Sequence, residues 1–248
     1  MVRRLIARGA LAGAFVLGLE TAYAILRPSP ELEQFDPSRH FGNGNSPQLR
    51  VAVLGDSSVT APGVAGPEEI WISHVCHRLA IDWHVEMKSF AVGGTMVKDL
   101  IEEQMEDAIL FDPDLVFVSV GANDAIKGVP KKKYARELDY LIGELTGTGA
   151  TVIQSGVGDL GTIPRLHPPL RNLVSRRAHA FDQVHWRVAD RHGSTVVDQR
   201  SDDLDVWYSD RSLWADDLFH VSADGHARWA EIVWRTVEPL VKNNDAEV

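Results

Sequence analysis

The chain has 248 residues, of which 44% are hydrophobic and 24% are charged, and its formal net charge is −10 at pH 7. This composition is typical of a globular protein and excludes a largely disordered chain. The excess of negative charge argues against nucleic acid as a partner, because phosphate binding requires a basic face. Cys76 is the only cysteine, so no intrachain disulfide can form.

Residues 1–26 combine a basic start with a long apolar stretch. Three arginines in the first eight residues precede an apolar run, Gly9 to Leu26, in which Glu20 is the one charged residue. This order is typical of a signal peptide, and Ala22-Tyr23-Ala24 resembles a cleavage site. The run is also long enough for an uncleaved membrane anchor. Either form predicts export, with the protein secreted or anchored to the outer face of the cytoplasmic membrane. An amphipathic helix on a cytosolic protein is the alternative.

The rest of the chain divides into a linker, one domain and a short tail. Residues 27–47 are rich in Pro, Gly, Ser and Asn and have no hydrophobic period, which is typical of a linker. We expect a domain over residues 48–242 and a tail over residues 243–248. No repeat of fixed length occurs, which excludes solenoids and propellers.

Within the domain, short apolar runs alternate with helical patterns. The run Pro113–Gly121 is nearly all apolar, which is typical of a strand that is buried on both faces. The repeated β-α order predicts an α/β fold, a three-layer α/β/α sandwich around a parallel five-stranded sheet of the flavodoxin-like kind. In chain order the expected strands are residues 49–55, 83–92, 113–121, 150–156 and 194–199, and the expected helices are residues 68–80, 96–110, 132–145, 171–191 and 223–241.

Four polar segments follow these strands or precede the last helix: Gly55–Ser58, Gly93–Thr95, Gly121–Gly128 and Asp216–His226. Reactive groups in parallel sheets lie at the carboxyl ends of the strands, so these segments are expected at one edge. They supply a hydroxyl, a glycine pair, an Asn-Asp pair and an Asp/His pair, the inventory that acyl transfer needs. Each segment alone also fits a turn or a helix cap, so it is their joint occurrence that indicates chemistry.

The same segments resemble the conserved blocks of the SGNH hydrolases, also called the GDSL esterase/lipase family. The resemblance extends from Leu49 to about Val241, and "VLGDSSV" is similar to the first block, which implies Ser57 as the nucleophile. "SFAVGGT" is similar to the second block, whose glycine N–H lies in the oxyanion hole. Gly94 fits that position, with its neighbour Gly93 as the alternative.

Two further blocks complete the resemblance. "VGANDA" is similar to the third block and implies Asn123 as a side-chain donor to the oxyanion. "DLFH" is similar to the fifth block and implies Asp217 and His220. Three positions depart from the usual pattern without removing a catalytic group. They are Ser58 in place of a leucine, Ser89 in place of an asparagine and Val221 in place of a proline.

The family resemblance implies a serine esterase or lipase that hydrolyses carboxylic esters through an acyl-enzyme. Ser57 would attack, His220 would act as the base, and Asp217 would orient the imidazole. The oxyanion would be held by the N–H groups of Ser57 and Gly94 and by the side chain of Asn123. No cofactor and no metal are implied. The expected substrates are small acyl esters, lipids or acylated glycans, and the N-terminal segment provides a route to membrane association.

Other functions fit the same residues. An acyltransferase or a deacetylase acting on a glycan or lipid would use the same residues, and a non-catalytic binding module would keep the fold. An α/β-hydrolase is disfavoured because Val59 stands where its G-x-S-x-G elbow has a glycine. The long loop Gly156–Asn172 is a candidate pocket wall, with Arg165, His167 and Arg171 as candidate substrate contacts. The aromatic candidates for the lining of an acyl or sugar site, or for core packing, are Trp207, Tyr208 and Trp214.

Overall fold

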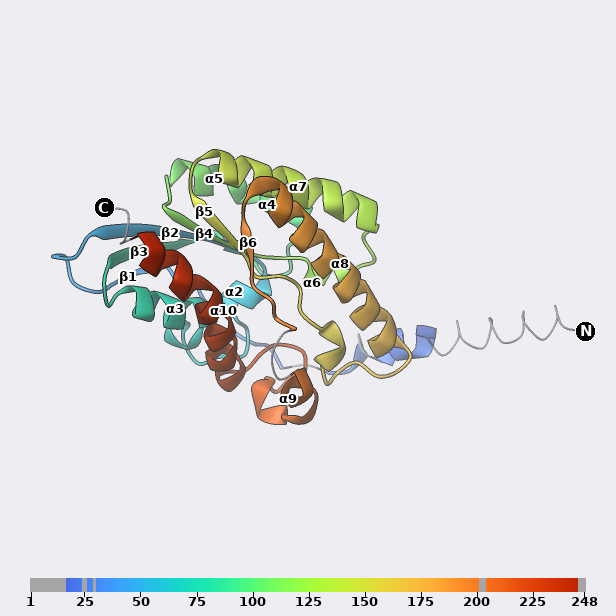
Figure 1. Cartoon of the computed structure of the whole chain (residues 1–248). Coiled ribbons are helices and arrows are strands. Elements are labelled where there is room, and N and C mark those ends of the chain that lie inside the picture. Colours follow the sequence, from blue (N-terminus) through green and yellow to red (C-terminus); the bar gives the residue numbers. More distant parts are fainter. Residues whose placement is uncertain (1–16, 24–25, 29, 201–203, 245–248) are drawn as a thin grey trace, which may run out of the picture.

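The computed structural model describes residues 17–23, 26–28, 30–200 and 204–244 (Figure 1). Most of the predicted signal peptide or anchor, and the tail from residue 245 onward, lie outside the described residues. Residues 17–23 are helical. None of the described helices combines the length and the apolar character that a membrane span requires. The export predicted from residues 1–26 therefore stays a prediction.

The described chain forms one six-stranded sheet in the order β1-β3-β2-β4-β5-β6. Strands β2 to β6 are all parallel, which confirms the predicted five-stranded parallel sheet. Counted from β2, their order is 2-1-3-4-5, the flavodoxin-like order, and it reverses beside β2. The strands are β1 (Arg39–Phe41), β2 (Gln48–Gly55), β3 (His84–Ser89), β4 (Leu115–Ser119), β5 (Thr151–Gln154) and β6 (Thr195–Val196).

The sixth strand, β1, comes from the segment predicted as a linker. It pairs antiparallel with β3, with Arg39 opposite Met87 and Phe41 opposite Val85. The Phe41 side chain is buried in one of the two core clusters, which holds the segment to the edge of the sheet. The linker prediction missed this strand because three residues are too few to show an alternating pattern.

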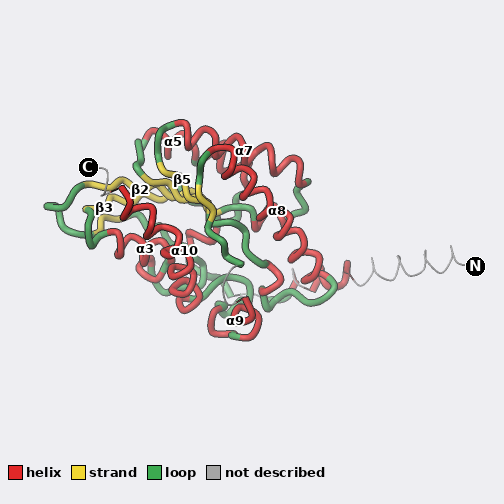
Figure 2. Tube along the Cα trace, viewed as in Figure 1, coloured by secondary structure: helices red, strands yellow, loops and turns green. Residues whose placement is uncertain are grey.

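Helices cover both faces of the sheet, as Figures 1 and 2 show. Helices α4, α5, α7 and α8 lie over one face, and α3 and α10 lie over the other. This confirms the predicted three-layer sandwich. The helices are α2 (Ser57–Thr60), α3 (Trp71–Leu79), α4 (Val97–Glu103), α5 (Met105–Leu110), α6 (Ala122–Ile126), α7 (Lys131–Gly147), α8 (Leu170–His192), α9 (Leu204–Ser209) and α10 (Ala223–Asn244), with 3₁₀ turns η1 (Pro67–Glu69), η2 (Leu160–Thr162) and η3 (Arg211–Leu213).

The period-2 alternation of the central strands builds the two cores. In β2, Ala52 and Leu54 face the α7/α8 layer, whereas Val51 and Val53 face the α3/α10 layer. All five residues of β4 are buried, as the apolar run predicted. Apolar side chains project from both faces of these strands, so helices must cover both faces of the sheet. Polar groups that react with a ligand are therefore found at the ends of the strands.

The predicted helix over residues 96–110 is broken at Gln104. There the backbone leaves helical geometry, with φ −122°, and α5 begins at the next residue. The Gln104 side chain is buried and clamps the last residue of β2. Its Oε1 accepts from the Gly55 N–H at 3.0 Å, and its Nε2 donates to the Gly55 carbonyl at 3.0 Å. A side chain at residue 55 would approach the Ser119 carbonyl to 2.8 Å, so this strand end requires glycine.

Candidate active site

The predicted nucleophile lies where β2 ends and α2 begins. Ser57 is the first residue of α2, and Asp56 caps that helix by accepting from the Ser58 N–H at 2.9 Å. The other Asp56 oxygen accepts from Asn123 Nδ2 at 2.9 Å, which ties the turn to the loop after β4. Burial raises the pKa of Asp56, although the hydrogen bonds from Ser58 and Asn123 oppose it. The turn lies at the end of β2, beside the point where the strand order of the sheet reverses. Ligands of open α/β sheets bind at such points.

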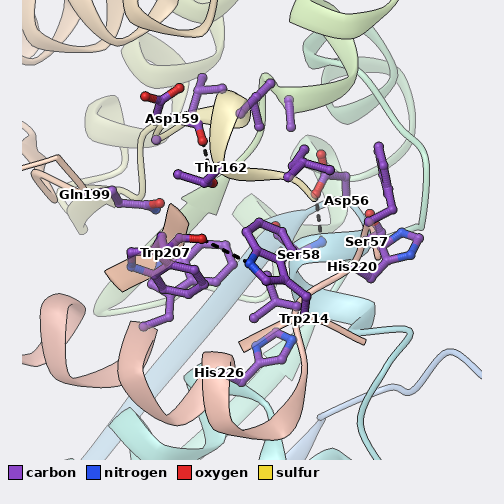
Figure 3. A pocket seen from close by; sticks show the side chains of 18 of the residues that line it. Asp56, Ser57, Ser58, Asp159, Thr162, Gln199, Trp207, Trp214, His220 and His226 are labelled. Carbon is purple, nitrogen blue, oxygen red and sulfur yellow. Dashed lines mark hydrogen bonds between the residues drawn. The ribbon is translucent and has the colours of Figure 1, made fainter. Parts of the chain in front are cut away.

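The structure separates the two neighbouring serines. Ser58 Oγ shares a 2.7 Å hydrogen bond with Ser119 Oγ at the end of β4, and the Ser58 carbonyl accepts from Trp71 Nε1 at 2.9 Å. Ser57 Oγ makes no hydrogen bond within the described part of the chain. Ser57 and His220 line the same two cavities, and Figure 3 shows them at one end of the first. The unengaged hydroxyl of Ser57 thus fits the predicted nucleophile better than that of Ser58.

Asp217 and His220 form a close pair on the loop before α10. Asp217 Oδ2 lies 2.6 Å from His220 Nδ1, and Asp217 Oδ1 accepts from the Phe219 and His220 N–H groups at 2.9 Å each. Burial alone would raise the pKa of Asp217, but these hydrogen bonds outweigh it and leave the pKa below its ordinary value. An ionised carboxylate can only accept, so Nδ1 carries the proton and Nε2 keeps its lone pair. This is the arrangement that a general base requires.

The predicted oxyanion donors meet at the same strand ends. Gly94 has φ +83°, a conformation that favours glycine, and it lines a cleft with Ser57, Asn123 and Gly93. No hydrogen bond among the described residues uses the N–H of Ser57, Gly93 or Gly94. Asn123 Nδ2, in contrast, donates both to Asp56 and, at 3.1 Å, to the Thr95 carbonyl. The two amide hydrogens of Asn123 are thus engaged in this structure.

Residues 53–228 match the GDSL-like Lipase/Acylhydrolase family. The chain belongs to this family. The match covers the turn that holds Ser57, the loops that hold Gly94 and Asn123, and the loop that holds Asp217 and His220. The domain described above is therefore an ester hydrolase of this family. No curated protein sequence matches this chain.

Solved structures of TesA and of two esterases share the fold at low sequence identity. TesA aligns with a TM-score of 0.62 and 23% identity, covering 77% of this chain and 99% of TesA. Axe2, an acetylxylan esterase from Geobacillus stearothermophilus, aligns with a TM-score of 0.62 and 19% identity, covering 79% and 95%. EstA, a psychrotrophic esterase from Pseudoalteromonas sp. whose structure is inhibited by monoethylphosphonate, aligns with a TM-score of 0.62 and 17% identity, covering 78% and 99%. These similarities confirm the SGNH hydrolase fold.

One of the two cavities in this SGNH hydrolase is an apolar pocket of about 150 Å³ (Figure 3). Trp207 and Trp214 both line it, with ring centroids 5.8 Å apart at 73°, as the sequence suggested. Tyr208 is exposed instead, and its hydroxyl donates to Asp159 Oδ2 at 2.9 Å. Large apolar side chains from several other segments also line the wall, among them Ile126, Leu160, Ile163, Leu204, Phe219 and Ile232.

The loop Gly156–Asn172 contributes to that wall through its first half, from Val157 to Ile163. The side chains of this loop that were predicted to contact the substrate do not take that place in the structure. The guanidinium of Arg165 is buried and donates to the Asp217 carbonyl at 3.0 Å, and that of Arg171 donates to the Leu166 carbonyl at 2.9 Å. His167 is absent from the lining of both cavities. The loop therefore shapes the pocket and supports the Asp217 loop.

The second cavity, here called the polar cleft, has a volume of about 330 Å³ and includes residues 30, 32 and 34 of the predicted linker. The Phe35 N–H donates to the Thr60 carbonyl at 2.8 Å, and Thr60 Oγ1 donates to Gln34 Oε1 at 2.9 Å. A side chain at Gly93 would meet that Gln34 oxygen at 2.2 Å. The linker thus forms a wall of the site, which its composition did not predict.

Sequence reasoning also missed three residues that support or line the site. Gln104 clamps Gly55, and Asp56 joins the nucleophile turn to Asn123. His226, in the first turn of α10, lines the apolar pocket beside His220. The family block containing Gly-Asp-Ser could have pointed to Asp56. Gln104 and His226 carry no local signal, because their partners are distant in the sequence.

Proposed function

We propose that this SGNH hydrolase cleaves carboxylic esters through an acyl-enzyme on Ser57. The observation that carries the proposal is the Asp217–His220 pair, with Nδ1 held at 2.6 Å, on a histidine that shares both cavities with Ser57. Asp217 fixes the proton on Nδ1, so Nε2 is free to accept the Ser57 proton. A serine hydroxyl becomes a competent nucleophile only with such a base beside it.

The proposed reaction proceeds in two halves. Ser57 Oγ attacks the ester carbonyl carbon while His220 Nε2 takes its proton. The tetrahedral intermediate then expels the alcohol, which receives that proton. Water repeats the sequence on the acyl-enzyme and releases the acid. The oxyanion is held by the N–H groups of Ser57 and Gly94, and Asn123 joins them by exchanging its bond to the Thr95 carbonyl, the longer of its two.

The two cavities suggest where the parts of the ester bind. We assign the acyl group to the apolar pocket and the alcohol to the polar cleft beside Gly94 and Gln34. A dry protein cavity of about 150 Å³ holds a molecule the size of benzene, so the pocket accommodates an acyl group of about six carbons. Each buried methylene contributes about 0.8 kcal/mol, so hexanoate would gain up to about 3 kcal/mol over acetate.

A chain-length series tests both the reaction and the assignment. We would measure kcat/KM for p-nitrophenyl esters from acetate to decanoate, with acetylated xylan as a parallel substrate. The proposal expects a maximum near hexanoate and little release of acetate from xylan. Absence of turnover for every ester would overturn the function. A maximum at acetate would overturn the acyl assignment alone and favour a deacetylase.

We also propose that the protein acts outside the cytoplasm, as the basic and apolar order of residues 1–26 suggests. A fusion of residues 1–26 to a reporter that is active only after export tests this directly. Export of the reporter supports the proposal. Retention in the cytoplasm would contradict it and favour an amphipathic helix.

A further inference from the structure

His226 is a second histidine in the apolar pocket, and the proposed reaction does not use it. It lies six residues after His220, is 1% exposed, and lines the pocket together with Ser57 (Figure 3). Its ring stacks on Trp229, with centroids 6.0 Å apart and planes at 15°. The pocket is otherwise walled mainly by apolar side chains, so a buried imidazole there calls for an explanation.

One ring nitrogen of His226 has a structural role that fixes the tautomer. The N–H of Trp71, the first residue of α3, points to His226 Nδ1 at 3.4 Å. Helix α3 has no side-chain cap at Ile70, so His226 supplies this acceptor. A backbone N–H can only donate, and Nδ1 must therefore be unprotonated. In the neutral ring the proton then sits on Nε2.

The ring is neutral at physiological pH. Burial lowers the pKa of His226 to about 3, and the positive charges that His74 and His220 can carry lower it further. Nε2 therefore presents one neutral N–H donor. Within the described ranges no acceptor is bound to it. Among the pocket's other polar side chains, those of Gln199 and Thr162 are engaged, whereas Ser57 Oγ and Trp229 Nε1 have no hydrogen-bond partner among the described residues. Gln199 Nε2 donates to Ser155 Oγ at 2.6 Å and Thr162 Oγ1 to the Asp159 carbonyl at 2.7 Å.

We propose that His226 Nε2–H donates a hydrogen bond to an oxygen atom carried by the acyl chain of the substrate. The preferred acyl group is then about six carbons long and bears a neutral ether, keto or hydroxyl oxygen. A carboxylate is disfavoured because an apolar pocket offers no counter-ion to a buried charge. A plain alkyl chain in the pocket would leave this buried donor unpaired, which is costly. This inference rests on the proposed acyl-enzyme reaction and on the acyl assignment to the pocket.

An oxygen scan along the acyl chain tests the proposal. The probes are p-nitrophenyl hexanoate and three analogues in which an ether oxygen replaces the methylene at position 3, 4 or 5. An ether oxygen accepts but does not donate, which matches the donor on His226. Each kcat/KM is divided by the rate of spontaneous hydrolysis, because an oxygen near the carbonyl activates the ester. We expect one analogue to exceed hexanoate by about fivefold or more.

The variant His226→Phe retains an aromatic ring against Trp229 and removes both the Nε2 donor and the Nδ1 acceptor of the Trp71 N–H. We expect its kcat/KM for the best oxygenated analogue, divided by its kcat/KM for hexanoate, to fall by about fivefold or more relative to the wild type. His74→Phe, on α3, is the matched control and should keep the preference. A preference that persists in His226→Phe, or none in the wild type, would overturn the inference. Hydrolysis of hexanoate in either case would leave the proposed function standing.

A second measurement avoids dependence on the folding of the variant. In wild-type protein with ¹⁵N-labelled histidine, the proton on Nε2 of His226 is observed before and after phosphonylation with hexyl and oxa-hexyl phosphonates. We expect a shift of the Nε2 proton resonance with the matching oxa-hexyl reagent that the hexyl reagent does not produce. Identical spectra for the two adducts, or a proton found on Nδ1, would contradict the proposal.

Discussion

Replacing Asp217 by asparagine probes the geometry of the Asp217–His220 pair and its proposed catalytic role. Asparagine keeps one oxygen to accept from the Phe219 and His220 N–H groups, both at 2.9 Å, so the loop should retain its shape. The Nδ2 group that replaces the second oxygen cannot accept from His220 Nδ1, 2.6 Å away. The imidazole then places its proton on Nε2 to accept the new N–H, and Nε2 can no longer take the proton of Ser57. Loss of the correct tautomer in a serine triad costs about 10⁴-fold in kcat.

Asp216→Asn supplies a matched control, because it removes the same charge from the neighbouring exposed residue. The assay is steady-state hydrolysis of p-nitrophenyl hexanoate, with thermal unfolding of each variant recorded in parallel. We expect Asp217→Asn to lose about four orders of magnitude in kcat with little change in Tm, and Asp216→Asn to match the wild type. An Asp217→Asn enzyme within tenfold of the wild type would refute this account of the pair. Equal losses in the two variants would show that net charge, and not orientation, matters.

Three further predictions follow from the loops around Ser57. Asn123→Ala should lower kcat by about 10²–10³-fold with an unchanged fold, and a loss below tenfold in ester hydrolysis would remove Asn123 from the oxyanion hole. Gln104→Ala leaves the Gly55 N–H unpaired and should lower the free energy of unfolding by about 2 kcal/mol in urea titrations. Gln104→Glu keeps an acceptor for that N–H but turns a buried carboxylate oxygen toward the Gly55 carbonyl, so it should lose at least as much, and a Glu variant as stable as the wild type would contradict this role. Burial raises the pKa of Asp124 to about 6, so the stability that its carboxyl contributes is present below about pH 4 and is lost as the pH rises through 6. Asp124→Asn should therefore be more stable than the wild type at pH 8 by on the order of 1–3 kcal/mol, a gap that closes towards pH 4, and equal Tm values at both pH values would contradict this.

The sequence predicted the layers of the fold because they follow from local patterns. The nearly all-apolar run before Gly121 predicted a strand buried on both faces, and β4 is buried at every position. The repeated β-α order then limited the topology to a doubly wound sheet, and the observed parallel order agrees. Strand β1 at Arg39–Phe41 is three residues long and lies in a polar stretch, so it carries too little pattern to predict, and its pairing with β3 holds it in place.

The positions of the candidate residues in the fold were predictable where a residue type is tied to a local motif, and their catalytic roles stay predictions. Ser57, Gly94, Asn123, Asp217 and His220 all lie at the expected strand ends and loops. What the sequence did not indicate are side chains whose partners are far along the chain.

Two residues illustrate that limit. Gln104 has ordinary helical surroundings in sequence, yet it turns to the backbone of Gly55, 49 residues away. Gln34 lies in a polar, Pro-rich stretch but reaches Thr60 and forms part of the polar cleft. Such contacts follow from packing of distant segments, which no periodicity encodes.

Covalent labelling of Ser57 tests the central claim most directly. The protein is treated with a fluorophosphonate, and the modified residue is located by peptide mass spectrometry in the wild type, Ser57→Ala and Ser58→Ala. We predict one adduct per chain, on Ser57, which persists in Ser58→Ala and is absent from Ser57→Ala. An adduct on Ser58, or a chain that stays unlabelled while the esterase EstA used as a control is modified, would contradict the acyl-enzyme mechanism proposed here.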